Sequence, residues 1–283
     1  MKFAQYYSND GSTKVALVKD GKLFPLFFEG DMIDLINTGF GVEQDNHGHL
    51  PTEVPFAPAV SRPSKIIALG LNYRDHAEES KGKTPENPLI FAKFPNSLTA
   101  HMGKICWNTN ITTKVDYEAE LAVIIGNETI NCSEEGALNN VFGYACANDV
   151  SARDLQFGDG QWVRGKSLDT FCPLGPWIVT RDELPDPNNL RIACRVNGQI
   201  MQESNTSNMI FSVAEIISFL SRHFTLYPGD VILTGTPSGV GAFREPPVYL
   251  KDGDEVVVDI EGIGSLSNTC SARTCLFIGE PKK

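Results

Sequence analysis

The feature that most constrains this chain is an apolar segment that carries two glutamates near its start. Residues 115–126 read VDYEAELAVIIG, and an apolar run that ends at glycine predicts a buried strand. Because residues two apart on a strand point to the same face, Glu118 and Glu120 would aim at one point. Two like charges inside an apolar element repel each other and lose hydration, so they require a cation or a proton close by. We therefore expect the fold to be built around this pair.

Length, charge and hydropathy limit the classes of protein to which the chain can belong. Its 283 residues are enough for one large domain, or for a large domain and a small one. A formal net charge of -11 argues against nucleic acid and anionic membranes as partners. No window approaches about 18 consecutive apolar residues, and the first residues lack the apolar core of a signal peptide. The sequence predicts a soluble cytoplasmic protein, and a mitochondrial location stays open because a presequence could have been removed.

Residues 1–60 differ in pattern from the rest of the chain and predict a small N-terminal α+β module. Residues 15–26 read as a β-hairpin with an Asp-Gly turn. Residues 31–36 read as a short amphipathic helix that Asp31 caps. Residues 41–64 are polar and rich in proline, as linkers are. We expect the module to end near residue 60 and a larger domain to span residues 61–283.

The larger domain reads as α+β and rich in strands. Helices are expected after Asn72 as a cap, after Ser151 as a cap with Asp154 close to a capping box, and over residues 212–221. Residues 80–88 predict a mobile loop, and the Gly- and Pro-rich residues 161–176 predict an irregular segment. Strands are expected over residues 65–70, 89–94, 142–150, 190–203 (as a hairpin), 229 onward, 255–260 and 274–278.

A third carboxylate, Asp149, ends the apolar run of residues 142–150 about thirty residues after the glutamate pair. Three hard oxygen ligands without a neighbouring His or Cys suit Mg²⁺, Mn²⁺ or Ca²⁺, with water or substrate as the remaining ligands. The alternative is that each carboxylate caps a helix or pairs with a local Lys or Arg. From the residues alone, both interpretations stay open.

Three further features could carry chemistry, and each has an ordinary structural alternative. His76 and Glu79 lie one helical turn apart and could form a base with its orienting carboxylate, although a capping or surface histidine is common. Lys166 could stabilise negative charge or act as a base, although surface lysines are common. Residues 234–239, TGTPSG, resemble a backbone nest for an anion but lack the P-loop pattern.

Six segments, in this order, resemble those of the fumarylacetoacetate hydrolase family and together cover about residues 64–280. They are GLNYRDH (70–76), EAEL (118–121), NDVSARDLQ (148–156), GKS (165–167), VNG (196–198) and TGTPSGVG (234–241). The runs DTFCPLGP (169–176) and FREPPVYL (243–250) are most similar to the fumarylacetoacetate hydrolase domain-containing proteins within that family.

The resemblance implies a mixed β-roll or β-sandwich with a divalent metal at its mouth, usually in a homodimer. It implies Mg²⁺ or Mn²⁺ as the cofactor, with Ca²⁺ an option in crystals, and metal ligands at Glu118, Glu120 and Asp149. Some members use a further Asp, which would fall on Asp75.

The same resemblance implies the roles of residues around the metal. It implies catalytic groups at His76, Glu79 and Lys166 and substrate contacts at Arg153, Gln156 and Thr236. The larger fumarylacetoacetate hydrolases place their base histidine several residues further along, but this chain has no histidine between His76 and His101. Fumarylacetoacetate itself is therefore not the expected substrate.

The implied site suits a 2-oxo acid with a second carbonyl or carboxyl group, either a dicarboxylate or an acylpyruvate. Acylpyruvate hydrolysis is the first expectation, with His76, oriented by Glu79, activating water. Enol–keto tautomerisation or decarboxylation of oxaloacetate is the alternative, because all these reactions pass through an enolate that a metal and Lys166 would stabilise. A metal-binding family scaffold without turnover is the remaining hypothesis.

Overall fold

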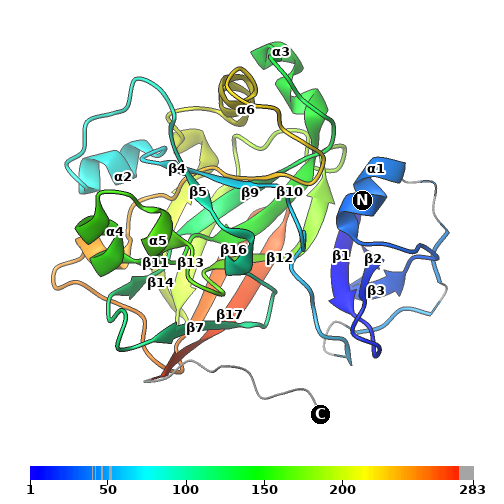
Figure 1. The fold of residues 1–283 in the computed structure, drawn as a ribbon, viewed down its shortest axis with the longest axis horizontal. Coiled ribbons are helices and arrows are strands. Elements are labelled where there is room, and N and C mark those ends of the chain that lie inside the picture. Colours follow the sequence, from blue (N-terminus) through cyan, green and yellow to red (C-terminus); the bar gives the residue numbers. More distant parts are fainter. Residues whose placement is uncertain (40, 42, 46, 51–52, 274–283) are drawn as a thin grey trace.

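The computed structural model describes residues 1–273 except residues 40, 42, 46, 51 and 52. The strand predicted over residues 274–278 lies outside the described residues. The described part is a β-rich mixture of sheets and short helices (Figure 1), which is the architecture that the sequence predicts.

One mixed sheet joins the N-terminal strands to strands from the rest of the described chain. Its strands, in spatial order, are β3 (Lys22–Pro25), β2 (Thr13–Lys19), β1 (Lys2–Tyr7), β12 (Cys172–Thr180), β10 (Val141–Asn148), β9 (Ala119–Ile125), β15 (Val231–Leu233), β4 (Ile66–Gly70) and β5 (Leu89–Lys93), with β6 (Leu98–Thr99) beside β12. The central strands β9 and β10 are buried along their full length, which explains their nearly continuous apolar sequences.

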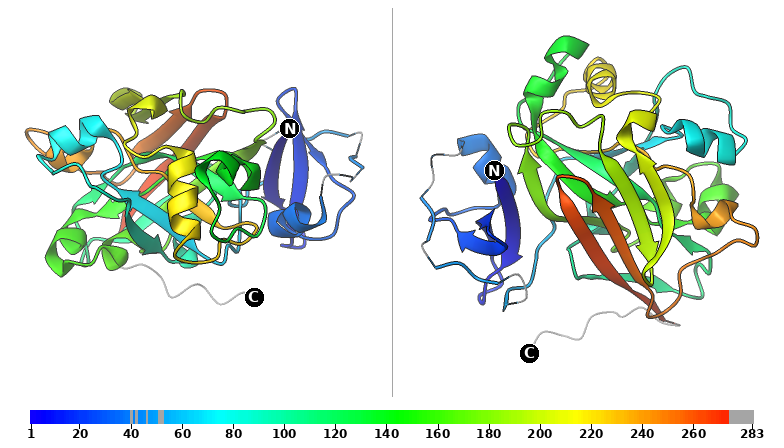
Figure 2. Two further views of the ribbon diagram at one scale, coloured as in Figure 1. Left: turned by 90° about the horizontal axis from the view of Figure 1, so that it is seen from above. Right: turned by 180° about the vertical axis from the view of Figure 1, so that it is seen from behind.

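A second sheet packs against the first. Its strands, in order, are β14 (Gln199–Asn205), β13 (Arg191–Val196), β16 (Glu255–Ile260), β17 (Gly264–Arg273) and β7 (Lys104–Asn108). Strands β13 and β16 contact β9, and β17 contacts β10 and β12, so the main hydrophobic core lies between the two sheets (Figure 2). A separate two-stranded ladder joins β8 (Val115–Asp116) to β11 (Ser151–Ala152).

The helices are short and lie around the sheets. They are α1 (Met32–Thr38), α2 (Arg74–Glu79), α3 (Glu134–Ala137), α4 (Arg153–Asp159), α5 (Val163–Lys166) and α6 (Val213–Ser221). The helix predicted over residues 212–221 is confirmed, because Ser212 and Glu215 form a capping box at the start of α6. Of the described helices, none is long and apolar enough to cross a membrane.

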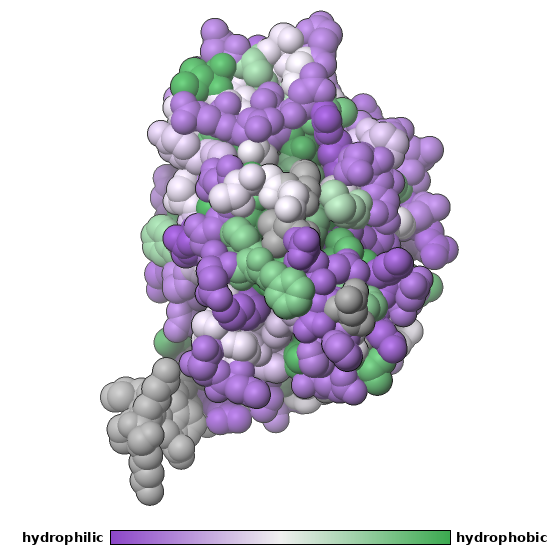
Figure 3. Space-filling model, turned by 90° about the vertical axis from the view of Figure 1, so that its right-hand side faces the viewer, coloured by the Kyte–Doolittle hydropathy of each residue, from purple (hydrophilic) through white to green (hydrophobic). Residues whose placement is uncertain are grey.

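The predicted hairpin and helix of the N-terminal module are present. Asp20 and Gly21, both with positive φ, turn β2 into β3, and Asp31 caps α1 in a capping box with Asp34. The module is not a separate layer, however, because β1 pairs with β12 and extends the large sheet. The face of the molecule on this side, seen in Figure 3, is mostly hydrophilic, with apolar side chains gathered near its centre.

The described part of the predicted linker is attached to its neighbours. Phe56 forms a bridge with Tyr6, and the Ala59 N–H donates to the Leu174 carbonyl at 3.1 Å. The hydrophobic cluster around Phe3 also includes residues of β4 and β9, so no separate core marks a boundary at residue 60 among the residues described. The division into residues 1–60 and 61–283 stays a prediction.

Several predicted local structures are wrong. Ser151 lies in β11, and α4 begins at Arg153 without a side-chain cap. Asp154 instead accepts a hydrogen bond from the Thr112 hydroxyl at 2.6 Å. Asn72 does not cap α2, because its amide bridges the carbonyls of Phe211 and Thr234. Residues 161–176, predicted as irregular, contain α5 and the start of β12. These side chains are used in contacts across the fold, which local propensity does not encode.

Candidate active site

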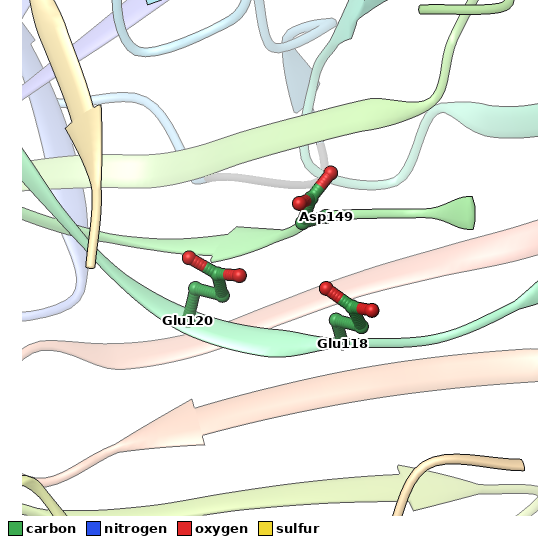
Figure 4. A group of neighbouring side chains, drawn as sticks. All are labelled: Glu118, Glu120 and Asp149. Carbon is green, nitrogen blue, oxygen red and sulfur yellow. The ribbon is translucent and has the colours of Figure 1, made fainter. Parts of the chain in front are cut away.

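The two glutamates of the sequence motif and Asp149 meet in a buried cluster (Figure 4). The predicted single strand over residues 115–126 is two strands, β8 and β9, and Glu118 lies in the break between them. The antiparallel register pairs Glu120 with Ala147, and the Asp149 N–H donates to the Glu118 carbonyl at 2.9 Å. One carboxylate oxygen from each of the three residues lies within 4.8 Å of the others.

Three buried cations surround these carboxylates. The Lys166 ammonium lies 2.7 Å from Glu118 Oε2 and 2.8 Å from Asp149 Oδ2. Lys93 Nζ lies 2.6 Å from Asp149 Oδ1, and Arg153 Nη1 lies 2.7 Å from Glu118 Oε1. The sequence left open that the carboxylates pair with Lys or Arg instead of binding a metal. These ion pairs confirm that alternative in part, because Glu118 and Asp149 do pair with basic residues.

Glu120 is the carboxylate that basic residues do not satisfy. Its Oε2 accepts a hydrogen bond from the Gly235 N–H at 2.7 Å, but its buried Oε1 has no partner among the described residues. Burial, together with the charges of Asp149 and Glu118, raises the pKa of Glu120 well above its usual range. For Glu118, burial acts in the same direction, but Lys166 and Arg153 lower its pKa to about 2.

These observations fit a divalent cation in the cluster. A buried carboxylate oxygen without a hydrogen bond is free to be the ligand of a cation. Two further carboxylates lie beside it and could complete a site for a cation that prefers oxygen ligands. Glu118, Glu120 and Asp149, the ligands that the family resemblance implies, would hold it. Asp75 is not in this group, because its carboxylate accepts hydrogen bonds from the Ser204 hydroxyl at 2.7 Å and the His76 N–H at 2.8 Å.

His76 and Glu79 form the predicted pair on α2. His76 Nδ1 lies 3.2 Å from Glu79 Oε2, and the other Glu79 oxygen accepts from the Gly239 N–H at 2.9 Å. Because an ionised carboxylate only accepts hydrogen bonds, the ring proton belongs on Nδ1, and Nε2 is left as the basic nitrogen. Glu79 is thus held by His76 through one carboxylate oxygen and by Gly239 through the other.

The backbone of the glycine-rich loop after β15 donates hydrogen bonds, but the acceptors are the protein's own carboxyl groups. Gly235 donates to Glu120, and Gly239 donates to Glu79. The backbone nest predicted for residues 234–239 therefore orders the site rather than presenting these N–H groups to a ligand.

A pocket of about 230 Å³ opens beside the cluster. Its polar lining consists of His76, Glu118, Arg153, Gln156, Lys166 and Thr236. Its apolar lining consists of Leu69, Leu71, Phe91, Phe157, Trp162 and Phe243. Ser80 and Gly82, from the loop predicted to be mobile, also line it. Six of the nine predicted site residues thus border one cavity, and the other three lie directly behind it: Glu79 beside His76, and Asp149 and Glu120 within the carboxylate cluster.

The predicted substrate contacts differ in what they can offer to a ligand. Arg153 Nη1 donates to Gln156 Oε1 at 2.9 Å, whereas the buried Nη2 has no partner among the described residues. The Thr236 hydroxyl donates to the Ala119 carbonyl at 3.0 Å and accepts from Gln202 at 2.8 Å. It retains only acceptor capacity, so Arg153 is the stronger candidate to bind a carboxylate.

Three polar residues of this site are not among those predicted from the sequence. Lys93 and Asp116 are buried and charged, and Gln202 bonds both Thr236 and the Ala119 N–H. A lysine inside the apolar run 89–94 and an aspartate beginning the run 115–126 were visible signals, because unpaired charges are rarely buried. Nothing local distinguishes Gln202.

The chain is similar to known proteins of one family. The family model described as fumarylacetoacetate (FAA) hydrolase C-terminal matches residues 65–271. The mitochondrial oxaloacetate tautomerase Fahd2a of Rattus norvegicus is 48% identical over 218 residues, which cover 77% of this chain and 69% of the relative. The mitochondrial oxaloacetate tautomerase FAHD2A of Homo sapiens is 47% identical over 219 residues, with the same coverage of both chains.

Solved structures resemble nearly the whole chain. The fumarylacetoacetate hydrolase of Exiguobacterium antarcticum has a TM-score of 0.87 at 39% identity, covering 96% of this chain and 100% of its own. The 5-carboxymethyl-2-hydroxymuconate delta-isomerase of Mycobacterium smegmatis has a TM-score of 0.81 at 34% identity, with the same coverage. The chain therefore has the predicted β-rich fold, belongs to the fumarylacetoacetate hydrolase family and is an enzyme of that family.

Proposed function

We propose that this enzyme interconverts the enol and keto forms of oxaloacetate with the help of a divalent metal. The observation that carries the proposal is that one cavity is bordered by a base, by a carboxylate of the cluster and by two buried cations, His76, Glu118, Lys166 and Arg153. The names of the curated relatives support oxaloacetate as the substrate. Tautomerisation, an alternative in the sequence interpretation, thereby ranks above acylpyruvate hydrolysis.

The metal would be Mg²⁺ or Mn²⁺, held by Glu118, Glu120 and Asp149. Both ions accept carboxylate oxygens and water in octahedral geometry, and the cluster offers only hard oxygen donors. A bound divalent ion supplies Lewis acidity that lowers the energy of negative charge on the 2-oxo oxygen.

His76 is the group that moves the proton. Tautomerisation removes one proton at C3 or at the enol oxygen and adds one at the other position. Nε2 of His76 exchanges the C3 proton, while Glu79 keeps the ring in the reactive tautomer through Nδ1. The Gly239 N–H fixes Glu79 in turn, so the ring is oriented before substrate arrives.

Lys166 acts as a fixed positive charge. Burial alone would lower its pKa, but Asp149 and Glu118 raise the pKa above its ordinary value. An ammonium that stays charged stabilises an enolate and is a poor base, which favours the first of its two predicted roles. Arg153 and Gln156 bind a substrate carboxylate, for which Arg153 retains a buried nitrogen without a partner among the described residues.

Acylpyruvate hydrolysis is the second candidate, and the apolar side of the cavity favours it. Leu69, Phe91 and Trp162 offer a surface suited to an uncharged acyl group rather than to a second carboxylate. In this reaction the same His76 would deprotonate water instead of carbon.

One experiment separates these functions. The purified enzyme is mixed with the enol form of oxaloacetate and, separately, with acylpyruvates, and both enol absorbance and pyruvate release are followed with Mg²⁺, Mn²⁺ or a chelator. We expect the enol form of oxaloacetate to disappear faster with the enzyme than without it, and no pyruvate to be released. The chelator should abolish this acceleration, and either metal should restore it. Pyruvate release from acylpyruvates alone would support hydrolysis, and pyruvate from oxaloacetate would support decarboxylation.

The same experiment tests the scaffold hypothesis, because a non-catalytic protein would change no substrate under any of these conditions. The predicted homodimer and the location in the cell stay predictions. The sequence favours the cytoplasm, whereas the curated relatives are named mitochondrial.

A further inference from the structure

We propose that Asp116 is the positioning residue that sets the shape of the active site, because one buried carboxylate fixes both Arg153 and the loop over His76. The inference concerns the site of the proposed function and rests on it for its kinetic part. Asp116 is not among the residues that line the pocket, so it would act entirely through its partners.

The hydrogen bonds of Asp116 are complete and come from different parts of the chain. Its Oδ1 accepts from the N–H groups of Tyr117 at 2.9 Å and Gly241 at 2.8 Å. Its Oδ2 accepts from the Ala242 N–H at 2.9 Å and from Arg153 Nε at 2.8 Å. The side chain is 0% exposed. All four partners are donors, so the position requires a group that only accepts.

The first consequence concerns the guanidinium of Arg153. Asp116 holds Nε, while Nη1 is shared between Glu118 and Gln156. Three of its partners thus fix the plane of the guanidinium group, and Nη2 has no partner among the described residues. Without Asp116, the Arg153 side chain would be held only through Nη1 and could rotate about that contact, so Nη2 would lose its fixed direction.

The second consequence concerns the pocket wall that packs against the His76 ring. Gly241 and Ala242 immediately precede Phe243, whose ring lies 5.8 Å from the His76 ring and lines the pocket. A Cβ on Gly241 would lie 1.8 Å from the Val248 carbonyl oxygen and 2.7 Å from Asp116 Oδ1, so the loop and Asp116 fit closely. Asp116 therefore connects Arg153, on the carboxylate-binding side of the pocket, to the loop that packs against the catalytic base His76.

The test uses Asp116→Asn with Asp230→Asn as the matched control. An asparagine at 116 keeps the shape but turns an NH₂ group toward at least one donor, so it breaks the arrangement without a cavity. Asp230 is also 0% exposed and accepts hydrogen bonds from Ser64, Lys65 and Tyr227, but it lies outside the pocket lining. Both variants should lose stability, and only Asp116→Asn should change the site.

The first measurement is the affinity for oxalate with Mg²⁺, by calorimetry, since this planar dianion resembles the carboxylate and 2-oxo oxygen of the substrate. We expect Asp116→Asn to weaken oxalate binding and to raise KM for oxaloacetate by about tenfold or more, with a smaller change in kcat. Asp230→Asn should leave both values unchanged. In an Arg153→Met background, Asp116→Asn should have little further effect on oxalate affinity, because the two residues act through one contact.

The second measurement is hydrogen exchange at residues 241–242, which should accelerate in Asp116→Asn and stay unchanged in Asp230→Asn. If Asp116→Asn does not fold, Asp116→Glu replaces it, since it keeps the charge and moves the carboxylate by one methylene. Equal oxalate affinities in wild type and variant, or effects that simply add to those of Arg153→Met, overturn the proposal.

The outcomes also separate this inference from the proposed function. Weaker oxalate binding in Asp116→Asn, in an enzyme that does not tautomerise oxaloacetate, supports the role of Asp116 and rejects the substrate. Tautomerase activity with equal KM in Asp116→Asn and Asp230→Asn supports the substrate and rejects the role of Asp116.

Discussion

Replacing Glu120 by glutamine should stabilise the metal-free enzyme and abolish its response to metal. The amide oxygen can still accept the Gly235 N–H, as Glu120 Oε2 does at 2.7 Å. The NH₂ group then replaces the buried oxygen that has no partner among the described residues, next to the carboxylates of Glu118 and Asp149. A repulsive charge therefore becomes a hydrogen-bond donor to the same neighbours.

The size of the effect depends on the separation of the charges. At an effective dielectric constant of about 20, two unit charges 4.8 Å apart repel by about 3.5 kcal/mol. Lys166 and partial protonation of Glu120 offset much of this repulsion. We expect a net gain of about 1–3 kcal/mol in the free energy of unfolding of the metal-free protein. The wild type should instead gain about 2.7 kcal/mol from metal at a hundred times its Kd.

Thermal unfolding with and without Mg²⁺ or Mn²⁺ measures both effects, at about 2–4 °C per kcal/mol for a domain of this size class. Because the pKa of Glu120 is raised in the fold, the stability from its protonated form is present at low pH and is lost as pH rises through the raised value. Glu120→Gln should remove this part of the pH dependence. Asp230→Asn, which loses the ion pair between the buried Asp230 and the half-buried Lys65, should destabilise the protein and keep the metal response. A Glu120→Gln variant that is less stable without metal, yet still stabilised by metal, would show that Glu120 is neither an unsatisfied charge nor a metal ligand.

Three further substitutions test other parts of the site. His76→Gln should lower kcat by roughly 10²–10⁴-fold with unchanged metal affinity by calorimetry, and normal turnover would exclude His76 as the base. Lys93→Met should cost about 3–5 kcal/mol in denaturant unfolding because it leaves Asp149 Oδ1 without its ion pair, whereas the exposed Lys251→Met should stay within about 0.5 kcal/mol; equal effects would contradict the buried pair. Gly70→Ala should lower the free energy of unfolding by about 1–3 kcal/mol and raise KM, since its Cβ would lie 2.5 Å from the Trp162 ring. Gly158→Ala, with open space around it, is the control. An unchanged KM in Gly70→Ala would show that Trp162 does not shape the pocket.

Much of the site could be predicted because charged residues stood out in apolar surroundings. Glu118, Glu120 and Asp149 were visible as carboxylates at the ends of buried strands, and the antiparallel register of β9 and β10 brings them together. His76 and Glu79 were visible through helical spacing, which depends only on local geometry.

The remaining parts depend on contacts between distant segments. Asp116 lies 125 residues from Gly241, and Lys93 lies 56 residues from Asp149, so no window of sequence reveals either pairing. The wrong helix caps at Asn72 and Ser151 have the same cause, because these residues bond to other elements or join a strand. Strand β17 was not predicted, since its alternation of small and polar residues is weak and its partners β16 and β7 supply the order.

The three carboxylates are expected to hold a divalent metal against the substrate pocket. Crystals grown with Mn²⁺ and oxalate, measured for anomalous scattering of manganese, would locate this metal. We expect one strong peak bounded by Glu118, Glu120 and Asp149, with oxalate in the cavity beside Lys166, and no such peak in Glu120→Gln. A peak elsewhere, or ordered oxalate in the pocket without manganese between these carboxylates, would contradict it.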